Sequence, residues 1–103
     1  MTGIIWYNHK TKHGRRKAFE RLDYLIEDYS KMNIMGNKVK KSYFFAFVQF
    51  ENGDYWRVFS TNENNRGACC NVSLIDDDIP QETIDVLIKP CTKGLPYQAI
   101  NYY

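Results

Sequence analysis

Apolar residues follow two different periods along the first part of the chain, and each period predicts a different element. The run Gly3–Tyr7 is short, apolar and rich in β-forming residues, which predicts a strand. After the polar, turn-like residues 8–14, apolar side chains return at steps of three and four. This spacing predicts a helix with one buried face, ending before Gly36-Asn37, a typical C-cap sequence. The buried positions would be Ala18, Phe19, Leu22, Leu25, Ile26, Tyr29 and Met32.

A longer apolar run and a hairpin signal occupy the middle of the chain. Residues 38–41 are a short basic approach to the run 42–50, both alternating faces of which are apolar. We therefore expect a central strand that is covered on both sides. Asn52-Gly53 is a strong hairpin signal, so residues 55–60 are predicted to return as the second strand of a hairpin. A further strand, 71–75, follows an irregular loop.

The last third of the chain predicts a second helix and a tail. Asp78 is placed to cap a helix that begins near Pro80 and buries Ile84, Leu87 and Ile88, and Pro90 is expected to end it. The Tyr-rich residues 95–103 either add an edge strand or stay mobile. The order β-α-β-β-β-α predicts an α+β fold, with a mixed sheet of about four strands and two helices.

Composition narrows this picture to one domain in a reducing compartment. The 103 residues, 44% of them apolar and 16% aromatic, suffice for a single core, so residues 1–103 are expected to form a single domain. Cys69 and Cys70 are adjacent and Cys91 stands alone, which is not a disulfide framework. We expect idle, free thiols. No signal peptide or membrane-spanning run is recognisable, so we expect a cytoplasmic protein without a membrane partner.

Charge is distributed unevenly and concentrates in one segment. Residues 1–50 hold ten Lys and Arg against four acidic residues, whereas residues 51–103 hold four against eight. Five cations fall within residues 9–17, beside His9 and His13, at the predicted N-terminus of the first helix. Acids would be more stabilising there, at the positive end of the helix dipole. The five cations are Lys10, Lys12, Arg15, Arg16 and Lys17.

This basic segment, defined by those five residues, has two interpretations. Cations beside the free N–H groups of a helix N-terminus suit a phosphate or a carboxylate-rich surface, which predicts binding of an anionic partner. The alternative is a solvated charge run that the acids of the C-terminal half neutralise. The sequence leaves both open.

A second signal is the apolar strand 71–75 that ends in Asp76-Asp77, with Arg66-Gly67 just upstream. This fragment is similar to the Walker B strand of phage terminase-type P-loop ATPases. The leading strand and its polar loop stand where that family keeps its phosphate loop. However, the Walker A motif G-x-x-x-x-G-K-[ST] is absent, because its first Gly, its Lys and its Ser/Thr are replaced. The residues at these positions are His9, Arg15 and Arg16.

The resemblance implies a shortened relative that does not hydrolyse ATP. It also implies that the strand 71–75 runs parallel to the first strand, which brings the basic loop and Asp76–Asp78 to the same sheet edge. There the acids either pair with the arginines of the segment, cap the second helix, or, in a degenerate nuclease or ATPase, hold Mg²⁺ through Asp76 and Asp77.

Other candidate chemistry is weaker. His9 and His13 have metal-ligand spacing, and Cys69-Cys70 could complete a site with them. Adjacent cysteines bind one ion awkwardly, however, so no metal site is expected and the cysteines are expected in the core. Trp6, Trp56 and the phenylalanines of residues 44–50 are also expected in the core. Aromatic side chains on a sheet are alternatively able to stack on bases, as in sheet-faced RNA-binding proteins, but the signature of that family is absent.

In size, in its Lys/Asn/Ile/Tyr-rich composition and in its terminase-like fragment, the chain resembles small accessory proteins of bacteriophages. Many of these inhibit host machinery, and they include anti-CRISPR proteins. The resemblance implies a non-catalytic inhibitor, with no cofactor, that binds a host nucleic-acid-handling protein in the host cytoplasm through the basic segment. The alternative is direct binding of nucleic acid or of a nucleotide phosphate by the same segment.

Overall fold

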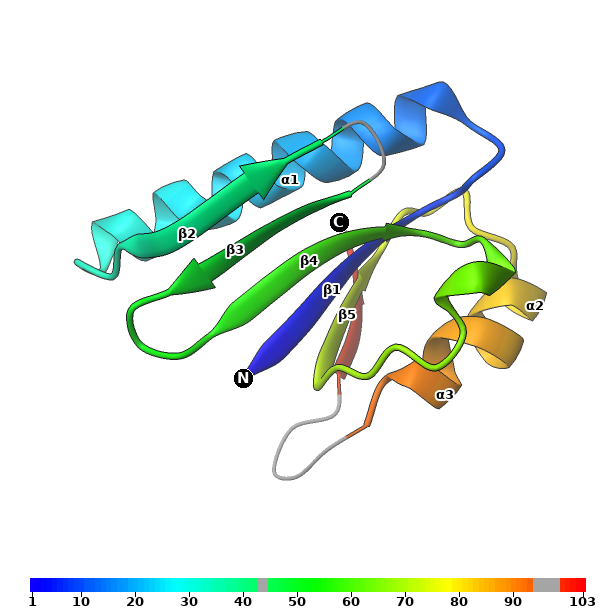
Figure 1. Cartoon of the computed structure of the whole chain (residues 1–103). Helices are drawn as coiled ribbons and strands as arrows, with labels where there is room; N and C mark the ends of the chain where they lie inside the picture. The colour runs from blue at the N-terminus through cyan, green and yellow to red at the C-terminus, as the bar shows by residue number, and fades with distance from the viewer. Residues whose placement is uncertain (43–44, 94–98) are drawn as a thin grey trace.

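A computed structural model describes residues 1–42, 45–93 and 99–103, and in that part of the chain a six-stranded mixed sheet lies between two helical layers (Figure 1). The strand order is β2-β3-β4-β1-β5-β6. The strands are β1 (Thr2–Tyr7), β2 (Gly36–Lys41), β3 (Ala46–Phe50), β4 (Tyr55–Ser60), β5 (Val72–Ile75) and β6 (Ala99–Tyr102). The helical elements are α1 (Lys12–Lys31), η1 (Glu63–Asn65), α2 (Gln81–Thr83), η2 (Ile84–Ile88) and α3 (Lys89–Cys91).

The expected α+β class is confirmed, but the expected number of strands is wrong. The two additional strands form the two margins of the sheet. β2 occupies the stretch expected to be a basic approach, and every residue in it after Gly36 is exposed. An edge strand without a buried face needs no alternation of apolar and polar residues, so the alternation that predicts a strand is missing from β2. β6 lies in the tail 95–103, of which residues 95–98 are outside the described residues.

Helix α1 differs from its expected boundaries at both ends. It begins at Lys12, because the Thr11 hydroxyl accepts a hydrogen bond from the Gly14 N–H at 3.2 Å and caps the first turn. It ends at Lys31, because Asn33 adopts the left-handed conformation with a φ of 61°. The C-cap signal at Gly36-Asn37 was therefore misleading, since those residues already belong to β2.

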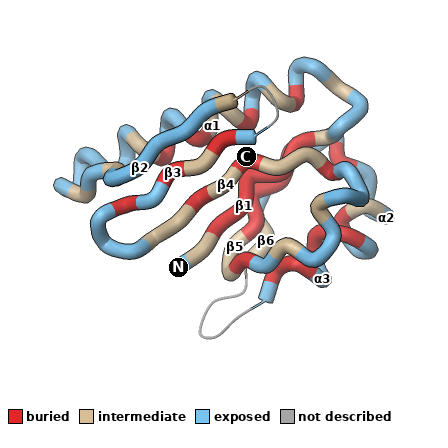
Figure 2. Tube along the Cα trace, in the orientation of Figure 1, coloured by how far each residue is buried: buried red, intermediate tan, exposed pale blue. Residues whose placement is uncertain are grey.

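Two apolar cores lie on opposite faces of the sheet (Figure 2). Helix α1 packs its buried face, including Leu22 and Leu25, on side chains of β1, β3, β4 and β5. The continuous helical segment 81–91 packs Leu87 and Ile88 against Ile4 and Trp6 on the other face of β1. Trp6 and Trp56 are buried, as expected.

Strand β3 is central but is covered on one face only. It pairs antiparallel with both β2 and β4, and the predicted turn is confirmed by Gly53, whose φ of 95° needs a residue without a Cβ. Alternate residues from Ala46 to Phe50 face α1, whereas Phe47 is half-buried and Phe45 is 38% exposed. The expectation of a strand buried on both sides is therefore wrong, and the expected core position is confirmed for Phe50 but wrong for Phe45 and Phe47. Tyr43 and Phe44 lie outside the described residues.

The second helical segment also departs from its expected ends. Asp78 does not cap it, since Pro80 occupies the N-cap position and no side chain bonds there. Pro90 does not end it, since α3 continues to Cys91. The preceding turn, η2, is a π-helix in which the Lys89 N–H bonds to the carbonyl of Ile84. A proline ring clashes with the carbonyl four residues back in a regular α-helix, and a widened turn relieves that clash.

Candidate functional site

The carboxyl ends of four parallel strands meet at one edge of the sheet. β1 runs parallel to β4 and to β5, and β5 runs parallel to β6. The loop after β1 carries the basic segment, and Asp76–Asp78 follow β5 directly. The expected parallel pairing and the placement of both signals at one edge are therefore confirmed. This is the edge at which open α/β sheets bind ligands.

The loop between β1 and α1 is fixed by contacts on both sides. The His9 N–H donates to the Thr61 hydroxyl at 3.2 Å, and the Thr61 N–H donates to the carbonyl of Tyr7 at 2.9 Å. On the other side, the Asn8 side-chain amide donates to the carbonyl of Asp78 at 3.3 Å. The start of the basic segment is thus held between the loops that follow β4 and β5.

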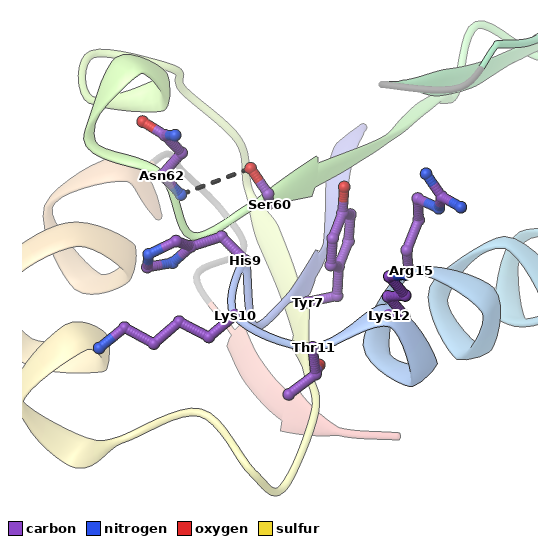
Figure 3. A pocket seen from close by; sticks show the side chains of 8 residues that line it. All are labelled: Tyr7, His9, Lys10, Thr11, Lys12, Arg15, Ser60 and Asn62. Carbon is purple, nitrogen blue, oxygen red and sulfur yellow. Dashed lines mark hydrogen bonds between the residues drawn. The ribbon is translucent and has the colours of Figure 1, made fainter.

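A pocket of about 420 Å³ lies beside this loop, between the end of β4 and the first turn of α1 (Figure 3). Three cations and one histidine reach it, together with hydroxyl and amide groups, and none of its lining residues is acidic. Such a lining suits an anion with several oxygen atoms. The lining residues are Tyr7, His9, Lys10, Thr11, Lys12, Arg15, Ser60 and Asn62.

Ser60 and Asn62 were not among the expected site residues. They reach the pocket because Tyr7 pairs with Ser60 in the register of β1 with β4, a long-range pairing that no local pattern reveals. The Asn62 N–H bonds to the Ser60 hydroxyl at 3.4 Å. In Figure 3 the Tyr7 ring lies between this pair and Arg15, and the Lys10 side chain extends away from Arg15.

Gly14 allows the first turn of α1 to pack closely on the loop. A Cβ at this position would lie 2.6 Å from the Thr11 hydroxyl and 3.5 Å from the backbone of Asn8. The glycine thus leaves room for the cap that fixes the helix start. That start carries Lys12 and Arg15 into the wall of the pocket.

Lys17 is a member of the basic segment that the acids neutralise. Its ammonium lies 2.8 Å from a carboxylate oxygen of Asp76 and 4.0 Å from one of Asp77. The hydrogen bond to Asp76 raises the pKa of Lys17. Asp76 is only 1% exposed, and its second oxygen, Oδ2, is buried without a hydrogen-bond partner among the described residues. The expected internal neutralisation is thus observed at Lys17.

The other members of the segment are placed differently. Lys10 and Lys12 are exposed, and within residues 1–42, 45–93 and 99–103 neither takes part in an ion pair. Arg16 is exposed and contacts the ring of His13 at 2.8 Å, and Arg15 is half-buried in the pocket wall. The pocket and the exposed side of the first turns of α1 therefore both carry positive charge.

The same edge offers little to a metal ion. In the described part of the chain, no three His, Cys, Asp or Glu side chains are grouped so as to hold one. The Lys17 ammonium occupies the position beside Asp76 where a cation would bind, and Asp77 points into solvent. The cysteines are free; Cys70 and Cys91 are buried, but Cys69 is exposed, so the expected core position is wrong for Cys69.

A smaller pocket of about 200 Å³ on the other side of His9 has a mixed lining. Glu63 and Glu82 face it together with Arg66, so it does not select an anion. Among the described helices, none combines the length and the apolar character needed to cross a bilayer.

The chain matches no family model, no curated protein and no solved structure. The resemblance to terminase-type ATPases and to phage accessory proteins therefore stays a prediction from the sequence.

Proposed function

We propose that this protein is a non-catalytic binding protein that takes up a phosphate-bearing ligand in the pocket beside the basic segment. The observation that carries the proposal is the pocket of about 420 Å³, lined by three cations and no acid, at the carboxyl ends of β1 and β4. This volume lies within the range of small-ligand sites, roughly 300–1,000 Å³. The ligand class would include nucleotides and the phosphorylated ends of nucleic acids.

In this proposal the side chains of the pocket have different roles in binding the phosphate. Lys12 and Arg15 supply charge from α1, and Arg15 offers the planar fork that pairs with two phosphate oxygens at once. Ser60 and Asn62 supply uncharged hydrogen bonds from the opposite wall. Lys17 takes no part, because Asp76 already engages it at 2.8 Å.

Isothermal titration calorimetry with inorganic phosphate and with ATP tests the proposal. The variant is Lys12→Gln/Arg15→Gln, and its charge-matched control is Lys31→Gln/Lys89→Gln, whose lysines pair with acids on their own helices. Each lost charge-assisted hydrogen bond is worth about 1.5–3 kcal/mol, so the pocket variant should bind at least about tenfold more weakly. Wild-type affinity in the pocket variant, or the absence of binding to both ligands, overturns the proposal.

A second candidate is the expected inhibitor of a host nucleic-acid-handling protein, acting in the cytoplasm through an acidic surface of that protein. The observation that favours it is Arg16, which is exposed on α1 outside the pocket and extends the positive surface beyond what a small ligand needs. A pull-down from host lysate with and without nuclease tests it, using wild type and Arg15→Glu/Arg16→Glu. A nuclease-resistant partner that only the wild type captures supports the inhibitor, whereas equal capture by both proteins excludes this surface.

A further inference from the structure

The face of β2, β3 and β4 that points away from α1 is a second surface, separate from the pocket. Residues opposite one another in the register share a face, and Phe47 of β3 lies opposite Lys40 on one side and Arg57 on the other. The helical segment 81–91 covers the corresponding face of β1, and of these three strands only Phe59 packs against that core. The loop before β5 reaches this face at Arg57, which donates to the carbonyl of Cys69 at 2.8 Å.

Three aromatic rings form a continuous row on it. The Phe45 and Phe47 rings lie 6.2 Å apart between centroids and nearly parallel, at 11°. The Phe47 and Tyr55 rings lie 5.7 Å apart, so the row crosses from β3 to β4. Phe45 is 38% exposed, and Phe47 and Tyr55 are half-buried. We call Phe45, Phe47 and Tyr55 the aromatic platform.

Three cations surround the platform. The Lys40 ammonium lies 5.5 Å from the centre of the Phe45 ring. The Arg57 guanidinium lies 5.6 Å from the Tyr55 ring and 5.0 Å from the Phe59 ring, and it also donates to the carbonyl of Cys69 at 2.8 Å. The third cation is Lys38, opposite Gln49 in the register. We call Lys38, Lys40 and Arg57 the face cations; none of the residues that share this face on the three strands is acidic.

We propose that this face binds single-stranded nucleic acid, with bases stacked on the aromatic platform and phosphates paired with the face cations. Aromatic rings that are at least partly exposed can stack on the bases of a single strand, and the cations beside them can pair with its phosphates. An acidic protein surface would use only the cations, and a purely apolar one only the rings. A duplex would present phosphates but would hide the faces of its bases. Gln49 is the single amide of the face, so the proposal includes little preference for sequence.

The inference goes beyond the proposed function, because the platform and the pocket share no residue. They lie near each other, since Ala46, next to Phe45, pairs with Val58, two residues before Ser60 of the pocket. An oligonucleotide could reach both, so the test has to separate them.

Fluorescence anisotropy of labelled oligonucleotides with the full chain is the test. Mixed-sequence single strands of DNA and of RNA are titrated beside the corresponding DNA duplex, and the two single strands show whether the sugar matters. Wild type should bind single strands more tightly than duplex. Phe45→Ala should weaken single-strand binding on the order of tenfold, since stacking on an aromatic side chain contributes that much per base. The matched control is Tyr24→Ala, which removes a ring that is 58% exposed on α1.

Lys40→Gln adds a readout that does not remove a ring, because it changes only an exposed charge beside the platform. Removing one phosphate contact should lower the slope of log affinity against log salt by about 0.7 for a single strand. The pocket variant Lys12→Gln/Arg15→Gln should lose phosphate binding yet keep single-strand binding that depends on Phe45.

Several outcomes overturn the inference. Wild-type affinity in both Phe45→Ala and Lys40→Gln excludes this face. Equal binding of single strand and duplex shows that only phosphates are recognised. Loss of single-strand binding in the pocket variant alone assigns the nucleic acid to the pocket instead. If Phe45→Ala abolishes self-association in sedimentation and leaves nucleic-acid binding intact, the occupant of the face is a second copy of the chain.

Discussion

The ion pair of Lys17 and Asp76 should lose different amounts of stability depending on which partner is removed. Asp76 is 1% exposed, whereas the Lys17 side chain is 46% exposed. Removing the lysine as Lys17→Met leaves a buried carboxylate without its cation. Removing the charge of the acid as Asp76→Asn leaves an ammonium that water can still solvate. Lys17→Met should therefore be the more destabilising change.

The magnitude follows from the exposure of the two partners. Breaking a fully buried ion pair by removing one partner costs about 3–5 kcal/mol. Here one partner is half exposed and water reaches the space that it leaves, so we expect about 2 kcal/mol for Lys17→Met and about 1 kcal/mol or less for Asp76→Asn. For a domain of this length, 2 kcal/mol corresponds to a Tm lower by on the order of 10 °C.

Urea unfolding followed by tryptophan fluorescence measures both variants, with Lys31→Met as the control. Lys31 lies on the same helix and is 3.9 Å from Glu27, with its side chain 70% exposed, so its loss should cost less than about 0.5 kcal/mol. The denaturant slope should stay unchanged. A cost for Lys17→Met no greater than that of the control, or a larger cost for Asp76→Asn, would refute the reasoning. Phosphate affinity should be the same in Lys17→Met as in wild type.

Further predictions concern the hydroxyl groups of Tyr29, which is buried, and Thr11, which is half-buried. Burial raises the pKa of Tyr29 from its ordinary 10.0 to about 12, so the stability that its neutral form contributes is complete below pH 10 and is lost as the pH rises towards 12. Burial also raises the pKa of Tyr103, so unfolding titrations over this range should show a smaller loss of stability in Tyr29→Phe than in wild type, and not its complete absence. Tyr29→Phe should itself cost about 2 kcal/mol at neutral pH, since the hydroxyl donates to Asp54 at 2.7 Å and accepts from the Trp56 indole at 3.2 Å. Thr11→Ala should cost about 1 kcal/mol in thermal unfolding by removing the cap of α1, and Thr11→Ser should restore most of it.

Sequence patterns predicted the helix and strands that have one buried face, but they did not predict β2, which has none. The periodic face of α1 and the Asn52-Gly53 turn were recognisable because local spacing alone determines them. β2 was not, because Val39 is its one large apolar residue and is 50% exposed. For β3 the error was the opposite, because a face predicted to be buried is partly exposed. An apolar row looks the same in sequence whether a helix covers it or it stays open, so Phe45 was assigned to the core.

The part of the candidate site that depends only on strand direction was predictable. Parallel β1 and β5 were sufficient to bring the basic segment to Asp76–Asp78. The sequence did not predict which cation pairs with the acids, since that depends on which face of α1 Lys17 occupies relative to β5. The contribution of Ser60 was not predictable either, because it rests on a strand register that pairs residues 53 positions apart in the chain.

β2 lies at the margin of the sheet, which bears on whether molecules of this protein associate with one another. An edge strand leaves a row of backbone N–H and C=O groups on which the same strand of another molecule can add. Three lysines on β2, Lys38, Lys40 and Lys41, would place like charges opposite one another in such a pair. Acetylation of these lysines would remove that repulsion, and high salt would screen it. Either condition should favour ordered strand-to-strand aggregates that the unmodified protein at low salt avoids.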